Sequence, residues 1–490
     1  MPLPTSLYRA DQVRELDRLA STELNIDSFS LMQRAGRSAW EILQANWPQA
    51  KYLCVVCGGG NNGGDGYILA GLALDGGLQV RTMSTIDPAD LTGDARRAYQ
   101  QFINKAGSES HQFSQDTLVA ADVIIDALLG TGIDREVAGA FREAIAAING
   151  SGKPVLAMDI PSGLHADSGA IMGVAVRAAI TVTFVGLKQG LFTGQGRECS
   201  GRIYFADLGL PELVYQRVKP AATRMDFSTQ SQLLQSRPRN AHKGHYGHVL
   251  VIGGDYGYAG AARMAAEAAA RTGAGLVSMA TRPGHALGIP MAVPEIMALG
   301  IEQSIDLQPL LDKATVVAVG PGLGQSAWAS SLLARVLETN LPLVLDADAL
   351  NLLARDPIAT DHWILTPHPG EAARLLQTTT SAIAADRFAS VRRLQEKFGG
   401  IIVLKGSGTL VADGMTVHLC SGGNPGMASG GMGDVLTGII AGLVAQNIGL
   451  TDAARLGVCL HAAAADAAAD DGERGMLATD LMPWVRKLIN

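Results

Sequence analysis

Two stretches of the sequence combine glycines with polar side chains in a way that suits a phosphorylated ligand. The first, residues 58–66, reads GGGNNGGDG, and we expect it to lead from a strand into a helix over residues 67–74. Glycine lets the backbone approach a pyrophosphate closely, and the free N–H groups of a helix start attract anions. A glycine-rich turn alone is a weak signal, since many are only structural. Asn61, Asn62 and Asp65 favour a binding role, because a turn does not require side chains that orient ligands or coordinate hard cations.

The second stretch, NPGMASGGMGDVLTG over residues 424–438, is the more informative of the two. Gly430, Gly431 and Gly433 crowd the start of an apolar helix, and Asp434 follows them directly. Such a nest of N–H donors binds an anion. Phosphoryl transfer needs hydrogen-bond donors directed at the transferred phosphoryl group. It also needs a base near the hydroxyl that accepts this group. The simpler alternative is a carboxylate that only stabilises the helix start.

Further polar residues directly follow apolar runs. Asp126 lies in VIIDALLG, Asp159 in LAMDIPSG and His368 in TPHPGE. Aspartate also caps turns, and a histidine in such a loop can be purely structural. Each of these residues could therefore have a structural role instead of a functional one. We expect Asp126 and Asp159 to converge with Asn62 at one edge of a sheet.

The elements that position these residues alternate between apolar, β-rich runs and helical segments. After a helical opening over about residues 11–43, the runs are YLCVVC, LQVRTMS, DVIIDALLG, PVLAMDIP, ITVTFV and RIYFADL. The pattern weakens over residues 210–243, which we interpret as a domain junction. A second series follows with HVLVIGG, GLVSMAT, TVVAVGPG, LPLVLDADA, HWILTPHPGE and IIVLKGSGTLVA. This alternation predicts α/β domains with mostly parallel sheets covered on both faces and ligands beyond the carboxyl ends of the strands.

The bulk composition agrees with two domains and excludes some partners. A chain of 490 residues exceeds what one core usually organises. With 46 acidic against 39 basic residues, the net charge of -7 does not favour nucleic acid. The charged N-terminus lacks the apolar core of a secretory signal, and no stretch looks able to span a membrane, so we expect a cytoplasmic location. Cys54 and Cys57 fall inside a probable strand on opposite faces, which indicates buried hydrophobes rather than a redox or metal pair.

The first half resembles the NAD(P)H-hydrate epimerase family in three ordered motifs: NN-x-GD at residues 61–65, D-x-L-x-GTG at 126–132 and D-[IV]-PSG at 159–163. The resemblance implies a Rossmann-like three-layer α/β/α domain over residues 1–218, with Asp159 as the catalytic residue. It also implies a K⁺ ion held by Asn62, Asp126 and a backbone oxygen near Ser162. The hydrated dinucleotide would contact Asn61, Asn62, Gly63, Gly64, Asp65, Gly130, Thr131, Gly132, Ile133, Asp134, Arg135 and Glu136. At position 33 this sequence has glutamine where glutamate is common in the family. This difference affects only a peripheral contact.

The second half resembles the ribokinase-like superfamily, and its motifs narrow this to the ADP/ATP-dependent NAD(P)H-hydrate dehydratases. The motifs are HKGHYGHVLVIGG, VGPGLG, DADALN, TPHPGE, LKGSGT and GGMGD, spread over residues 243–484. The resemblance implies a second α/β/α domain over residues 225–490 that uses ADP and Mg²⁺, with Asp434 as the catalytic residue. The hydrate would contact Gly322 and His368. The nucleotide would contact Lys405, Gly406, Ser407, Gly408, Thr409 and Gly433.

Together the two resemblances imply repair of hydrated NADH and NADPH. The first domain would interconvert the R and S hydrates, and the second would dehydrate the S form with ADP, giving NAD(P)H, AMP and phosphate. The expected binding partner is therefore this small-molecule substrate. We also expect the chain to associate with copies of itself into a homo-oligomer. Two alternatives stay open: a ribokinase-like small-molecule kinase, which would accumulate a phosphorylated product, and a first domain that only binds a nucleotide. A passive scaffold would not require both Asp126 and Asp159.

Overall fold

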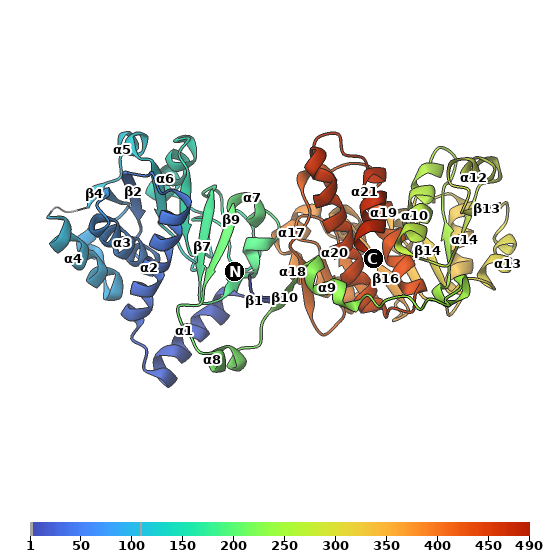
Figure 1. Ribbon diagram of the computed structural model, residues 1–490, viewed down its shortest axis with the longest axis horizontal. Helices are drawn as coiled ribbons and strands as arrows, with labels where there is room; N and C mark the ends of the chain where they lie inside the picture. Colours follow the sequence, from blue (N-terminus) through green and yellow to red (C-terminus); the bar gives the residue numbers. More distant parts are fainter. Residues whose placement is uncertain (1–2, 108–109) are drawn as a thin grey trace. The chain divides into compact units, whose positions relative to one another are not determined.

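The computed structural model describes residues 3–107 and 110–490. The chain divides into two compact units, one ending at Thr223 and the other running from Arg224 to Asn490. Each unit combines a largely parallel β-sheet with helices (Figure 1). The α/β fold class predicted from the alternating sequence pattern is therefore confirmed.

The first unit contains a seven-stranded sheet in the order β4-β3-β2-β5-β6-β7-β9, with all neighbours parallel. These strands are β2 (Tyr52–Cys57), β3 (Gln79–Ser84), β4 (His111–Gln112), β5 (Val123–Ala127), β6 (Val155–Met158), β7 (Ile180–Phe184) and β9 (Arg202–Ala206). A short strand β1 (Ser6–Tyr8) pairs with β8 (Leu187–Lys188) and with β10 (Ala222–Met225). The parallel strands share one direction, so the residues that follow them gather at one edge of the sheet.

Helices cover both faces of this sheet. One core cluster joins the sheet to α1 (Ala10–Leu24), α2 (Ser28–Asn46), α3 (Asn61–Asp75) and α4 (Gly93–Ala106). The other joins it to α5 (Gln115–Ala120) and α6 (Gly139–Gly150). Cys57 belongs to the first cluster and Cys54 to the second, on opposite faces of β2. The two short helices α7 (Gly196–Cys199) and α8 (Glu212–Arg217) follow.

Two helix boundaries differ from the sequence prediction. The opening helix is two helices, because α1 ends at Asn25 in a left-handed conformation with φ of 52°. Helix α3 begins at Asn61 rather than Tyr67, so the NNGGDG motif forms its first turns. The reason is close packing: a Cβ at Gly63 would lie 2.1 Å from the Gly58 carbonyl oxygen. Several glycines of the motif therefore bring the helix against its neighbours instead of forming an open loop.

The strands of the second unit follow the order β13-β12-β11-β14-β15-β16-β17-β18-β19. They are β11 (His248–Ile252), β12 (Leu276–Thr281), β13 (Met297–Gly300), β14 (Val316–Val319), β15 (Leu343–Leu345), β16 (Trp363–Leu365), β17 (Ile401–Leu404), β18 (Leu410–Ala412) and β19 (Val417–Cys420). Pairing is parallel from β13 to β17 and antiparallel from β17 to β19. The β-rich run IIVLKGSGTLVA forms the antiparallel hairpin of β17 and β18.

One face of this sheet packs in a single core cluster mainly against α10 (Ala259–Thr272), α19 (Met432–Ala445), α20 (Leu450–Ala468) and α21 (Leu481–Leu488). The remaining helices are α9 (Phe227–Gln230), α11 (Pro283–Ala286), α12 (Gly288–Ala292), α13 (Gln308–Leu311), α14 (Ala327–Leu337), α15 (Ala347–Leu353), α16 (Pro369–Leu375), α17 (Thr380–Ala385) and α18 (Arg387–Phe398). Among the described residues, no helix has the length and apolar character needed to cross a membrane.

Candidate active sites

A cavity of about 1050 Å³ lies beyond the carboxyl ends of β2, β5, β6 and β7 in the first unit. Most of the predicted contact residues line it: Asn61, Asn62, Asp65, Gly130, Thr131, Gly132, Ile133, Asp134, Arg135, Glu136 and Asp159. Gly63 and Gly64 do not line it, because both are buried where α3 packs on the chain around it. The cavity thus gathers residues from segments up to 195 positions apart in sequence, from Val13 to Leu208.

Asp159 is held at the cavity in a strained backbone conformation. It directly follows β6, has φ of 64°, and a non-glycine residue adopts this left-handed region at a cost. Its Oδ1 accepts hydrogen bonds from Lys188 Nζ and, at 3.2 Å, from the Phe184 backbone N–H. The side chain of Asp159 is 17% exposed, so one carboxylate oxygen is tied down while the group still reaches the cavity.

Lys188 places a positive charge in the lining of the cavity. Its side chain is 1% exposed, and besides Asp159 it donates to Thr183 Oγ1 at 3.1 Å and to the Phe184 carbonyl oxygen at 2.8 Å. A buried ammonium is tolerated only with such partners. The Lys188–Asp159 pair is therefore a fixed charged element of this site.

Two more carboxyls surround this pair and hold protons more readily than usual. Burial raises the pKa of Asp17 to about 6, with Lys188 opposing and Asp159 adding to the shift. Burial also raises the pKa of Asp65 well above its usual value, and the charges of Asp159 and Asp17 add to this effect. Like charges crowded in one apolar pocket cannot all ionise easily. The cluster can therefore carry a proton near neutral pH, as acid–base chemistry requires.

Asp126 and Ser162 lie beneath the cavity rather than on its lining. Both are fully buried, and Asp126 accepts hydrogen bonds from Ser162 Oγ at 2.6 Å and from the Ser162 backbone N–H at 2.8 Å. Burial raises the pKa of Asp126 to about 6 although these hydrogen bonds lower it. Nearby Asn62 is buried with neither its amide oxygen nor its nitrogen partnered. A buried amide without partners and a buried carboxyl form a donor set that a hard cation would satisfy.

The sequence interpretation missed Asp17 and Lys188. Asp17 belongs to the amphipathic helix α1, and Lys188 to the two-residue strand β8, so neither sits in a recognisable motif. The only available signal was the lysine in an otherwise apolar segment, VTFVGLKQGLF. A lysine there is also compatible with an exposed turn.

In the second unit, the glycine-rich stretch ends where α19 begins. Gly431 is the N-cap residue with φ of 93°, and Asp434 lies in the first turn of the helix. A Cβ at Gly433 would lie 3.2 Å from Lys405 Nζ and 3.5 Å from Asp346 Oδ2. The start of this helix therefore lies close to the charged groups that follow β15 and β17, and glycine leaves room for the Lys405 ammonium there.

Lys405 is the centre of a buried ionic network. Its Nζ lies 2.5 Å from Asp346 Oδ1 and 4.0 Å from Glu371 Oε2. Thr437 Oγ1, one turn into α19, donates to Asp346 Oδ2 at 2.8 Å. Burial alone would raise the pKa of Asp346, but Lys405 holds it below its usual range. Burial lowers the pKa of Lys405, but Asp346 and Glu371 together keep it above its usual value.

This network leaves Asp434 as a carboxyl poised to exchange a proton. Burial raises the pKa of Asp434 to about 7, the charge of Asp346 adds to the shift and Lys405 opposes it. Burial likewise raises the pKa of Glu371 to about 7. A base is most effective when its pKa lies near the working pH. Asp434 is such a base, and the N–H groups of the helix start beside it can hydrogen-bond to a phosphoryl group. The two requirements of phosphoryl transfer are therefore met at one place.

The predicted residues Gly322 and His368 follow β14 and β16, on either side of β15, at the same edge of the sheet. Gly322 has φ of 59°, and a Cβ there would lie 2.6 Å from the Tyr258 carbonyl oxygen. His368 caps α16: its Nδ1 accepts from the Gly370 backbone N–H at 2.9 Å, and its Nε2 lies 3.3 Å from Glu371 Oε1. Burial and the charge of Lys405 lower the pKa of His368, so it is neutral at pH 7.

The segment from Gly406 to Thr409 forms the turn between β17 and β18. Arg387 donates to the carbonyl oxygens of Lys405 and Gly408, each at 3.3 Å, and so fixes both ends of the turn. A Cβ at Gly406 would lie 2.9 Å from an Arg387 nitrogen. Ser407 and Thr409 are carried on this turn beside Lys405.

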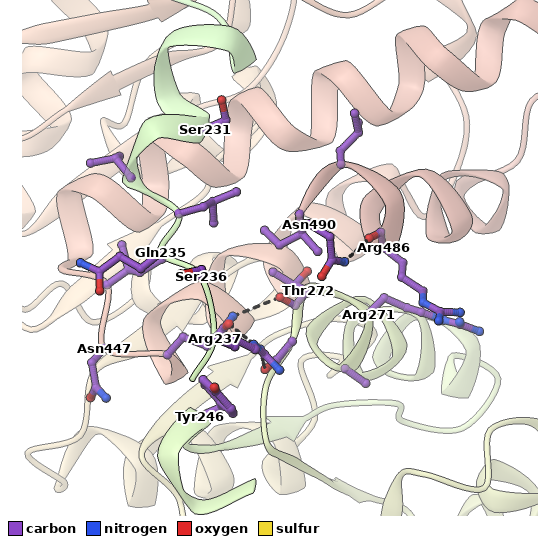
Figure 2. Close-up of a pocket in the computed structure, with 18 of the residues that line it drawn as sticks. Ser231, Gln235, Ser236, Arg237, Tyr246, Arg271, Thr272, Asn447, Arg486 and Asn490 are labelled. Atoms are coloured by element: carbon purple, nitrogen blue, oxygen red, sulfur yellow. Dashed lines mark hydrogen bonds between the residues drawn. The ribbon is translucent and has the colours of Figure 1, made fainter. Parts of the chain in front are cut away.

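A larger cavity of about 1470 Å³ in the second unit lies away from this chemistry. None of the predicted site residues lines it. Tyr246 and Thr272, which precede β11 and β12, place it at the amino ends of these strands, opposite the edge where such sheets bind ligands. Arg237 crosses it, stacks 3.8 Å from the Tyr246 ring centroid and donates to Gln446 Oε1 at 2.7 Å (Figure 2).

Two α/β units, each with a carboxylate-rich site beyond the carboxyl ends of parallel strands, define a two-domain enzyme with one site in each domain. Comparisons with known proteins identify it further. The family model described as YjeF-related protein N-terminus matches residues 28–190, and that described as NAD(P)H-hydrate dehydratase matches residues 249–487.

The curated relatives match over the whole chain. A protein of Coxiella burnetii named bifunctional NAD(P)H-hydrate repair enzyme Nnr is 50% identical over 99% of this chain and 100% of its own length. The Escherichia coli protein of the same name is 42% identical over 100% of this chain and 95% of its own. The chain therefore belongs to the bifunctional NAD(P)H-hydrate repair enzyme family, as its motifs predicted, and the kinase alternative is not supported.

Among solved structures, a ribokinase-like superfamily protein from Enterococcus faecalis aligns with a TM-score of 0.51 and 30% identity, covering 54% of this chain and 94% of its own. A Streptococcus mutans protein of unassigned function aligns equally well, with 33% identity over 54% of this chain and 98% of its own. These matches agree with the ribokinase-like fold expected for one of the two domains.

Proposed function

We propose that this enzyme repairs hydrated NADH and NADPH in two steps at two sites. The domain over residues 1–218 interconverts the R and S hydrates. The domain over residues 225–490 dehydrates the S hydrate with ADP and yields NAD(P)H, AMP and phosphate. The observation that supports this most strongly is Asp434, whose pKa is raised to about 7 by burial, at the start of α19 and beside the Lys405–Asp346 pair.

In the dehydratase domain, the C6 hydroxyl oxygen of the hydrate attacks the β-phosphorus of ADP. Asp434 accepts the proton of this hydroxyl. The bond between that phosphorus and the bridging oxygen breaks, and AMP leaves. Hydroxide is a poor leaving group but phosphate is a good one, so the ring nitrogen then expels phosphate from C6. Loss of a proton from C5 completes the double bond and restores the dihydropyridine.

The other predicted residues bind the two reactants. The turn from Lys405 to Thr409 and the N–H group of Gly433 hold the nucleotide, with Lys405 supplying positive charge. Gly322 and His368 contact the hydrate, and the neutral His368 offers a hydrogen bond without adding charge. Mg²⁺ accompanies ADP, because this ion retains water and binds through phosphates with one or two carboxylates. Glu371, buried close to Lys405, is a suitable carboxylate.

In the epimerase domain, Asp159 faces C6 of the hydrate ring. Inversion requires the C6–O bond to loosen and reform on the other face, so a carboxylate stabilises the transient cation. The raised pKa values of Asp17 and Asp65 leave a proton available in the same cluster for the departing oxygen. Lys188 fixes the position of the Asp159 carboxylate.

The substrate lies across Asn61, Asn62 and Asp65 and along the segment from Gly130 to Glu136, while Gly63 and Gly64 contribute through the packing of α3. K⁺ is held by Asn62, Asp126 and a backbone oxygen near Ser162. When bound, the ion supplies positive charge for the phosphates of the dinucleotide. The unpartnered amide of Asn62 supports this assignment.

We place the enzyme in the cytoplasm as a homo-oligomer that binds neither nucleic acid nor membrane. The net charge of -7 supports the exclusion of nucleic acid. A cytoplasmic location suits a substrate that arises from the cell's own NADH and NADPH.

The stoichiometry of products tests the dehydratase assignment. With S-NADH hydrate and ADP, each molecule of NADH formed should be matched by one AMP and one free phosphate. An Asp434→Asn variant should form none of the three while still binding ADP. Accumulation of a phosphorylated organic product, with no free phosphate, would instead indicate a kinase.

A further inference from the structure

The glycine-rich loop of the second unit runs from the end of β19 at Cys420 to the start of α19 at Met432. Five of its eleven residues, 421–431, are glycines, and outside the 3-10 turn Pro425–Met427 its described backbone is irregular. Such a chain keeps one conformation only where neighbouring elements hold it, because glycine loses much conformational freedom on ordering. Helix α20 is the adjoining element, since it packs against α19 (Figure 1) and against β19.

The start of this loop is bound by Asp466 of α20. Asp466 Oδ2 accepts a hydrogen bond from the Gly423 backbone N–H at 2.9 Å, and Asp466 Oδ1 accepts one from Asn424 Nδ2 at 3.0 Å. The amide of Asn424 is thereby oriented, and its oxygen accepts a hydrogen bond from the Gly426 backbone N–H at 3.0 Å. Hydrogen bonds to a carboxylate are stronger than those between neutral groups. One side chain of α20 therefore fixes the first turn of the loop.

The end of the loop is bound by His461 of the same helix. Its side chain is 6% exposed and hydrogen-bonds to the backbone of Met432, the first residue of α19. Its Nε2 has no hydrogen-bond partner among the described residues, so Met432 is the contact that orients the ring. Burial and the charge of Lys405 lower the pKa of His461 to about 4. The neutral ring therefore holds Met432, between Gly431 and Gly433, without adding charge to the anion site.

Both anchors belong to a helix that is itself fixed in the core. Leu460, Ala462, Ala464 and Ala465, the neighbours of these two residues on α20, are all part of the core cluster of the second unit. Donors for a transferred phosphoryl group are effective only when they are aimed before the reaction begins. A misplacement of about 1 Å can cost on the order of a hundredfold in rate. Tying both ends of the loop to one helix keeps its N–H groups in place.

We propose that Asp466 and His461 are positioning residues of the dehydratase, which hold the two ends of the glycine-rich loop and aim its N–H groups at the transferred phosphoryl group. The inference rests on the proposed dehydratase function, because the loop is given its role by that reaction. Neither side chain is required to touch a substrate. Residues of this kind act on the transition state, so their loss lowers kcat and leaves the binding of ADP nearly unchanged.

An Asp466→Ala variant of the full chain tests the anchor at the start of the loop. With S-NADH hydrate and ADP, kcat should fall at least about tenfold. The Kd of ADP, measured by calorimetry, should stay within about threefold of the parent's value. Asp452→Ala is the matched control, because Asp452 is a half-exposed carboxylate on the same helix that pairs with Arg455 at 3.3 Å. This control should keep the parent's kcat. Asp466 is exposed, so both variants should keep the parent's thermal midpoint.

Two substitutions of His461 test the anchor at the end of the loop. His461→Gln keeps an N–H donor for the Met432 backbone, whereas His461→Leu fills the buried site without one. The glutamine variant should retain most of the parent's kcat, and the leucine variant should lose at least about tenfold. If the ring only filled space in the core, the apolar leucine would be the better replacement. A leucine variant more active than the glutamine variant would therefore overturn the role of His461.

The remaining outcomes separate this proposal from the proposed function. A parent-like kcat in either Asp466→Ala or His461→Leu would overturn the proposal while the dehydratase function stands. A higher KM for ADP at unchanged kcat would do the same, because the loop would then only bind the nucleotide. An equal loss in Asp452→Ala would mean that any change to α20 has this effect. A parent that forms no NADH from the S hydrate and ADP would instead refute the function, and this inference with it.

Discussion

Replacing Lys188 by methionine tests whether the epimerase site depends on its buried charge. The substitution keeps the length of the side chain but removes the ammonium, and with it the hydrogen bonds to Asp159, to Thr183 Oγ1 at 3.1 Å and to the Phe184 carbonyl oxygen at 2.8 Å. Asp159 then remains in its strained position beside Asp17 and Asp65 without the ammonium that paired with it.

The expected loss of stability follows from burial. Breaking a buried ion pair by removing one partner costs about 3–5 kcal/mol, because the remaining charge is uncompensated. Lys105 and Asp75 form a control pair in the same unit: they lie 2.5 Å apart, but their side chains are 42% and 57% exposed. Breaking an exposed pair costs at most about 1 kcal/mol. Lys188→Met should therefore lose several times more free energy of unfolding than Lys105→Met.

The free energy of unfolding of both variants is measured on the full chain in urea. Pulse proteolysis at each urea concentration reports the unfolded fraction of the first unit. The double variant Lys188→Met/Asp159→Asn should regain part of the loss, since it also removes the stranded carboxylate. Equal losses for Lys188→Met and Lys105→Met would refute the reasoning, because they would mean that Lys188 is no more desolvated than an exposed lysine.

Three further predictions concern the reactions. Because burial raises the pKa of Asp434 to about 7 and the base must be ionised, kcat/KM for dehydration should rise about tenfold per pH unit below pH 7 and level off above it. Asp346→Asn removes a charge that raises the pKa of Asp434, so this acid limb should move to lower pH; a limb that stays in place would exclude the coupling. Exchange of K⁺ for tetramethylammonium, or Asn62→Ala, should slow epimerisation and leave dehydration of the pure S hydrate unchanged, which separate assays of the two steps would show.

The sequence was sufficient to predict that the candidate residues lie at the carboxyl ends of strands. Asp159, Gly322, His368 and Lys405 each follow an apolar run, and parallel strands bring such positions to one edge. The spacing of glycines before Asp434 likewise predicted a helix start, which the structure has at Met432. These predictions succeeded because they depend on periodicity and local backbone chemistry, both of which are visible in a short window of sequence.

The charge partners could not be predicted in this way. Lys188 lies 29 residues from Asp159, and Lys405 lies 59 residues from Asp346, so only the folded packing reveals either pair. The role of the glycines in NNGGDG was also misjudged. Gly63 allows α3 to pack closely against Gly58. The motif alone does not show whether its glycines serve this packing or the approach of the backbone to phosphates. Tertiary approach distances, unlike periodicity, leave no local pattern.

The most direct test of the two-site account is repair of a mixture of R and S NADH hydrates with excess ADP. The parent enzyme should restore the full dihydronicotinamide absorbance. Asp159→Asn should restore only the share present as the S form, with the remainder recovering at the slow uncatalysed rate, and Asp434→Asn should restore none. Complete recovery by Asp159→Asn at the parent's rate, or any sustained recovery by Asp434→Asn, would contradict the account.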